Sequence, residues 1–110
     1  MKCDEESFTA KLIGIVSVEE GLKSDISDCI RVRANMENRE LKNDDIVAIF
    51  NITGTTSYQV FFIDDYSSLD YIKSEFRKLR TLLNYDSENI LITYIDKMEK
   101  VKNNDNLNKG

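Results

Sequence analysis

The chain has 110 residues, of which 41% are apolar, carries a net charge of −5, and contains no histidine, proline or tryptophan. This length fits one domain, and the missing histidine removes the usual general base and the commonest transition-metal ligand. The acidic balance argues against a general affinity for nucleic acid or for an anionic membrane surface.

Composition along the chain predicts a single α+β domain at residues 7–101. A polar, flexible arm at 1–6 precedes it, and a tail at 102–110 with one apolar side chain is expected to be disordered. No segment has the character of a signal peptide or approaches the length of an apolar membrane helix. We therefore expect a cytoplasmic protein with no membrane partner.

In the first half of the domain, the sequence pattern predicts two strands separated by a crossing segment. Residues 8–18 are rich in β-branched side chains, and Gly14 within them indicates a bulge or a close approach of another backbone segment. A short helical or irregular crossing follows at about 19–27. A strand is expected at about 29–36, because apolar and polar residues alternate there; the apolar set is Ile30, Val32, Ala34 and Met36.

A second interpretation of this region continues a helix to about residue 33. An apolar helical stripe supports it, formed by Val18, Leu22, Ile26 and Cys29. The element order then becomes βαββαβ, which is ferredoxin-like. The sequence leaves both interpretations open.

The second half predicts strands at 46–52, 58–63 and 90–95, the first two joined by a tight hairpin at 53–56. A helix is expected at about 68–84, where one apolar stripe repeats at helical spacing. Its members are Leu69, Ile72, Phe76, Leu79 and Leu83, and we expect Phe76 and Leu79 to be buried. The predicted fold is an antiparallel sheet of about five strands with this helix between the last two.

The strands predicted at 46–52, 58–63 and 90–95 carry large apolar side chains on both faces, so both faces need cover. The segment at 19–30, barrel curvature or another chain could supply it. Tyr71, Leu82 and Tyr85 project away from the helical stripe and are the candidate protein-binding residues. The alternative is that the two tyrosines lie along the flank of the domain with only their hydroxyls in water.

One dense basic cluster offers an alternative binding site. On the predicted helix Lys73, Arg77 and Arg80 share one flank, and Arg31 with Arg33 on a neighbouring strand would extend the patch. Such a patch could contact phosphate or an acidic partner. It could equally be a solvated flank whose cations pair with nearby carboxylates.

No residue pattern predicts catalysis, a metal site or a cofactor. Asp64 and Asp65 could hold a divalent cation in principle, but the end of a strand and the start of a helix explain them without one. Cys29 has no histidine to activate it and is expected to pack near the core.

These observations favour a non-catalytic, small acidic protein-binding module: an adaptor, a subunit or an inhibitor of a partner protein. The lysine-, asparagine- and isoleucine-rich composition would suit a mobile element. The alternative is a nucleic-acid-binding protein that uses the basic flank of the helix at 68–84. A carboxylate- and metal-dependent enzyme is the third hypothesis. A homodimer is left open.

Overall fold

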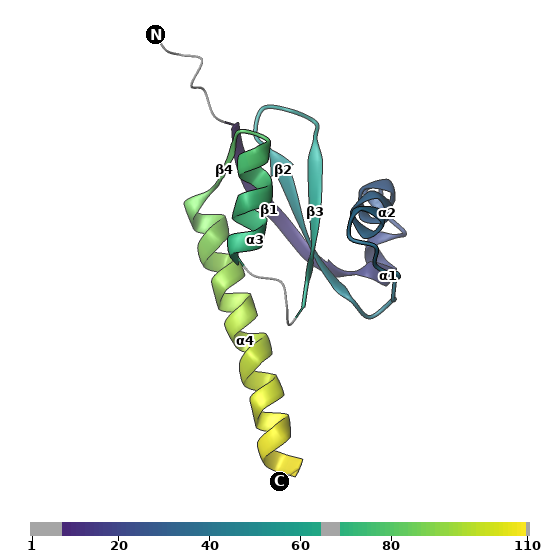
Figure 1. Ribbon diagram of the computed structural model, residues 1–110, viewed down its shortest axis with the longest axis vertical. Coiled ribbons are helices and arrows are strands. Elements are labelled where there is room, and N and C mark those ends of the chain that lie inside the picture. The colour runs from purple at the N-terminus through teal and green to yellow at the C-terminus, as the bar shows by residue number, and fades with distance from the viewer. Residues whose placement is uncertain (1–7, 65–68, 110) are drawn as a thin grey trace.

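The computed structural model describes residues 8–64 and 69–109, with side chains described as far as Met98. The chain is an α+β protein with a four-stranded mixed sheet between two helical layers (Figure 1). In chain order the elements are β1 (Phe8–Ser17), α1 (Val18–Gly21), α2 (Ser27–Met36), β2 (Ile46–Ile52), β3 (Tyr58–Ile63), α3 (Leu69–Lys78), β4 (Thr81–Leu83) and α4 (Tyr85–Lys109).

The strands lie in the order β3-β2-β1-β4. β1 pairs antiparallel with β2, from Ala10↔Ile52 to Ser17↔Ile46, and β2 pairs antiparallel with β3. The short β4 joins β1 in parallel. The register between β1 and β2 shifts between Leu12 and Gly14, which confirms the bulge predicted at that glycine.

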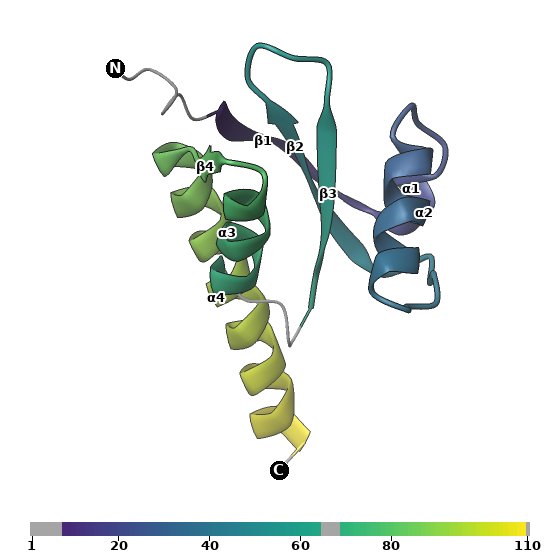
Figure 2. The same cartoon turned by 45° about the horizontal axis from the view of Figure 1, so that its top comes forward.

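Both faces of the sheet are covered, as the apolar strands required. On one face α1 and α2 enclose a core that includes Val18, Ile30, Val47 and Phe62. On the other face α3 and α4 enclose a larger core built around the rings of Phe50, Phe61 and Phe76. Successive strand residues point to opposite faces, so β2 and β3 contribute to both cores. Figure 2 shows the sheet between its two helical layers.

The predicted strand at 29–36 is wrong, because these residues form the helix α2. In a helix, residues four apart share a face, so Ile30 and Ala34 are both buried there. The opposing interpretation, a helix continuing to about 33, described this segment better. The βαββαβ order is present, but the sheet is not ferredoxin-like. In a split βαβ unit another strand separates the first two, whereas β1 and β2 here pair directly.

The predicted helix at 68–84 ends early. α3 stops at Lys78, and Arg80 adopts a positive φ of 56° that leads the chain into β4. The strand predicted at 90–95 is also wrong, because α4 runs through it. Leu91 is buried on α4, and Tyr94, Ile95 and Met98 pack around it at helical spacing.

The sheet therefore has four strands rather than five. The predicted arm at 1–6 lies outside the described residues. The domain limits at 7–101 stay a prediction; for residues 102–109 the structure describes a helical backbone, as part of α4. In the described part of the chain, no helix combines the length and apolarity needed to cross a membrane.

Phe76 and Leu79 were both expected in the core, and only Phe76 is there. Phe76 is 0% exposed between the rings of Phe50 and Phe61, whereas Leu79 is 49% exposed after the end of α3. We predict that Phe76→Ala lowers the free energy of unfolding by about 3–5 kcal/mol, because it leaves a cavity in the core. Urea unfolding measures this. The matched control, Leu79→Ala, should cost less than about 1 kcal/mol, and equal losses would contradict the placement.

Candidate protein-binding surface

The three residues predicted to bind a protein do not form one patch. Leu82 lies in β4 and Tyr85 begins α4, at one edge of the sheet, and both are exposed. Tyr71 belongs to the opposite edge: its ring packs edge-on against Phe61 of β3, with centroids 6.1 Å apart. Its hydroxyl donates to a carboxylate of α2's C-cap residue Glu37 at 2.9 Å. Tyr71 is therefore anchored within the fold, with part of its surface in water.

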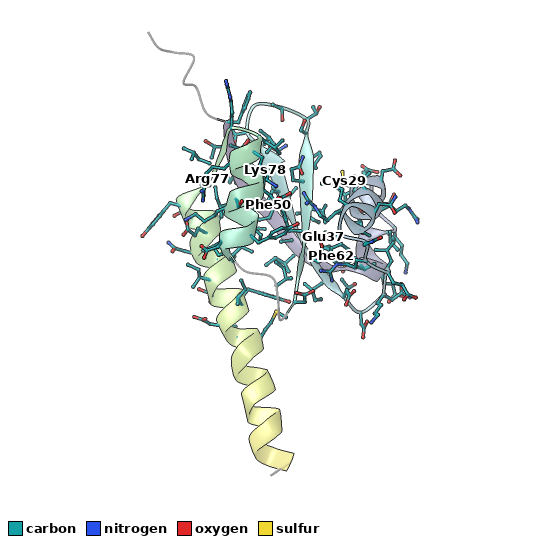
Figure 3. The ribbon with its side chains drawn as sticks, viewed as in Figure 1. Cys29, Glu37, Phe50, Phe62, Arg77 and Lys78 are labelled. Carbon is teal, nitrogen blue, oxygen red and sulfur yellow. The ribbon has the colours of Figure 1, made fainter. Side chains whose placement is uncertain are left out.

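The predicted basic patch is divided. Arg33 is buried, 5% exposed, and Lys73 pairs with Glu88 of α4 at 3.3 Å. Arg77, Arg80 and Arg31 are exposed, but Arg31 lies on α2, across the sheet from the other two. In Figure 3 the labelled Arg77 lies on α3, well away from α2.

The remaining candidates have structural surroundings. Asp64 pairs with Arg39 at 2.9 Å, and Asp65 lies outside the described residues. Cys29 is a free thiol on α2, partly buried against the core beneath that helix. Among residues 8–64 and 69–109, no group of three or more histidine, cysteine, aspartate or glutamate residues is placed to hold a metal ion.

Arg33 fixes α2 against the edge strand β3. Its Nε donates to the carbonyl of Val60 at 2.9 Å, and its terminal nitrogens donate to Gln59 and to Glu75 of α3, each at 3.3 Å. The guanidinium also stacks over the ring of Phe61, 4.3 Å from its centroid. One buried cation thus links the helices of both layers across the edge of the sheet.

Arg39 extends the contacts of Arg33 into an ionic network. Its members are Arg33, Glu37, Arg39, Asp64 and Glu75. Arg39 donates to Glu37 at 3.2 Å and to Asp64 at 2.9 Å, and it stacks over Phe62. Burial opposes the charge of Arg39, but the two carboxylates outweigh it and raise its pKa. Burial and the hydrogen bond to Glu37 raise the pKa of Tyr71. The labelled Glu37 and Phe62 lie close together beside β3 in Figure 3.

A groove lies directly beside this network, between α2 and β3. It encloses about 190 Å³. Three large apolar side chains stand exposed on it, namely Val32 and Met36 of α2 and Tyr58 of β3. Its other lining residues are Asp28, Cys29, Arg33, Gln59 and Val60. The thiol of Cys29 lies 3.9 Å from the Tyr58 carbonyl. Because Arg33 and Val60 are held in the network, we infer that the wall they form is fixed.

The sequence alone did not identify this groove. The strand predicted at 29–36 has Val32 and Met36 on its apolar face, and the strand predicted at 58–63 begins at Tyr58. A signal was available in the helical interpretation, since residues four apart on α2 share a flank. Nothing local in the sequence indicates that this flank meets β3.

The arrangement is that of an α+β protein with a mixed sheet between two helical layers and an apolar groove at one sheet edge. The chain belongs to the family described as Domain of unknown function (DUF749), whose model matches residues 8–95. It is 50% identical over 97 residues to Uncharacterized protein MJ0858 of Methanocaldococcus jannaschii, covering 88% of this chain and 85% of that protein. No solved structure matches the chain.

The ionic network predicts how stability depends on pH. A hydrogen bond from Lys78 and, against the effect of burial, a hydrogen bond from Arg33 hold the pKa of Glu75 below its ordinary value of 4.5. Because the pKa of Glu75 is lower in the folded state, its carboxylate stabilises the fold at any pH above the pKa that Glu75 has in the unfolded chain. This stabilisation is lost as the pH falls through the pKa of Glu75 in the folded state. Glu75→Gln should therefore destabilise by about 1–3 kcal/mol at pH 7.

Denaturant unfolding of both proteins between pH 7 and pH 3 tests this. The difference between wild type and Glu75→Gln should shrink once the pH falls below about 4.5, as the wild-type carboxylate becomes protonated. Glu40 is exposed and makes no ion pair with a described residue, so Glu40→Gln is the matched control, with little effect at either pH. A difference that does not depend on pH would refute the role of the Glu75 charge.

Proposed function

We propose that this protein is a non-catalytic protein-binding module whose α2–β3 groove receives an apolar segment of a partner protein. The observation that carries the proposal is the set of three exposed apolar side chains, Val32, Met36 and Tyr58, around one groove. Exposed apolar surface gathered in this way is typical of contact sites between proteins. An aromatic side chain and a flexible methionine are residue types enriched at such sites.

The ionic network favours side-chain docking over strand addition at this edge. A partner strand would need the outward backbone groups of β3, and the Val60 carbonyl already accepts from Arg33. The partner would therefore insert apolar side chains between α2 and β3. Asp28 on the groove and the net charge of −5 favour a basic residue beside the apolar ones. A cytoplasmic location remains part of this proposal.

The observed positions of the candidate cations weaken the alternative that this protein binds nucleic acid. A phosphate-binding surface needs several free cations on one face. Of the five candidate cations, Arg33 is buried and Lys73 is paired. Arg31 lies on the other side of the sheet from Arg77 and Arg80.

We predict that Val32→Glu and Met36→Glu each reduce recovery of a partner protein at least about tenfold, because a charge in the groove must be desolvated when the partner binds. The measurement is affinity capture from native cells, followed by mass spectrometry. Recovery by the wild type should change little between low and high salt, as expected for an apolar contact.

Arg31→Glu is the matched control, because Arg31 is exposed on the same helix and does not line the groove. It should recover the partner like the wild type. Thermal unfolding of all variants checks that each one folds. Nucleic acid recovered by the wild type and lost in Arg31→Glu or Arg77→Glu would instead favour the alternative function, as would a steep loss of binding with salt.

A further inference from the structure

The edge of β1 away from β2 is unpaired over most of its length. β2 runs beside β1 as far as Ser17, but β4 covers the other side only from Phe8 to Ala10. No other strand in the described part of the chain joins that side. At Leu12 the backbone N–H donates to Ser87 Oγ of α4 at 2.8 Å, so α4 lies against this edge.

Ile15 presents its backbone to the open edge. The N–H of Val18 donates to the Asp45 carbonyl, on the side of β2. Backbone groups of successive strand residues point to alternate sides, so Val16 and Gly14 also face β2 and Ile15 faces away from it. An unpaired, apolar strand edge of this kind is a template for pairing with another chain.

An exposed flank of α4 follows the contact between Leu12 and Ser87 along the helix. Lys73 of α3 pairs with Glu88, which marks the side of α4 that faces α3. Around the helix, Ile90 lies about 200° and Lys97 about 180° from Glu88, on the side away from α3. This flank carries a shallow groove of about 350 Å³, whose described lining residues are Asn89, Ile90, Thr93, Tyr94 and Lys97. In Figure 1 α4 is the outermost element on the side opposite α2.

We propose that the open edge of β1 and this flank of α4 bind a second copy of the chain. Antiparallel pairing of β1 with its own copy about a two-fold axis near Ile15 would join two sheets into one. The N–H and C=O of Ile15 in each copy would then bond those of the other. Residues 12–18 carry no charge, so two copies of this strand do not repel each other. This surface lies at the opposite edge of the sheet from the α2–β3 groove, and its test is independent of the proposed function.

The charges on α4 favour a second copy over an unrelated partner. A two-fold axis that pairs β1 with itself also sets the two α4 helices antiparallel. Centred between Leu91 and Ile92, that pairing places Asp86 of each copy opposite Lys97 of the other. Both side chains are exposed on the groove flank, and neither makes an ion pair with a described residue. Within one chain they lie about 16 Å apart along the helix, too far to pair.

Charge reversal tests the contact. Sedimentation velocity over a range of concentrations should show a dimer for the wild type. Asp86→Lys and Lys97→Asp should each weaken the dimer at least about tenfold in Kd, because like charges then face each other. The double variant Asp86→Lys/Lys97→Asp should restore the Kd to within about threefold of the wild type. An equimolar mixture of the two single variants should form a heterodimer.

Two isoleucines provide a matched pair of controls. Ile90 is 51% exposed on the groove flank, and Ile92 is 40% exposed on the side of α4 towards Glu88. Ile90→Glu should abolish the dimer and Ile92→Glu should not. Amide exchange at Ile15 should be slow in the wild-type dimer and fast in the folded Ile90→Glu monomer. A wild-type monomer at every concentration, failure of the double variant to restore association, or equal effects of the two isoleucine variants would overturn the proposal.

Discussion

The guanidinium of Arg33 joins the helices on the two faces of the sheet. A buried cation is costly unless its surroundings replace water, and here the Val60 carbonyl, Gln59, Glu75 and the Phe61 ring do so. This contact is available only because β3 is an edge strand, which lets a side chain from α2 reach α3 around the edge of the sheet. Together with the packing of Ile30 and Ala34 against Val60 and Phe62, this side chain holds α2 beside β3 and so contributes to the shape of the apolar groove.

The two edges of the sheet are protected in different ways. At β3, Arg33 occupies the Val60 carbonyl and Arg39 stacks over Phe62, so side chains cover the edge. At β1, beyond the short β4, the described residues supply hydrogen bonds from Asn84 N–H to the Ala10 carbonyl and from Leu12 N–H to Ser87. The first edge is suited to receive side chains and the second to receive a strand. This difference supports separate roles for the two surfaces, one towards a partner protein and the other towards a second copy.

Local signals were sufficient for the first three strands and for the fold class. The strands at 8–17, 46–52 and 58–63 and the bulge at Gly14 follow from β-branched runs, turn residues and a glycine within a strand. The apolar side chains on both faces of the strands at 46–52 and 58–63 indicated cover on both sides, and α1 with α2 on one face and α3 with α4 on the other provide it. The start of α3 was also predictable, whereas its end depends on Arg80 adopting a positive φ, which no residue type there indicates.

The two misassigned segments failed for one physical reason, which is that tertiary contacts override local pattern. On α2 the buried residues are Ile30, Arg33 and Ala34, so the inward stripe of the helix contains a cation. With a polar residue at that position, apolar and polar residues alternate along the segment as they do in a strand. In α4 the β-branched residues at 90–95 suit a strand, but Leu91, Ile95 and Met98 meet the core at helical spacing. A buried arginine is tolerated only where the fold supplies its partners, and those partners come from β3 and α3, far along the chain. Arg33 therefore both gives this segment the alternating pattern of a strand and joins α2 to β3, and the groove between them could not be predicted without that contact.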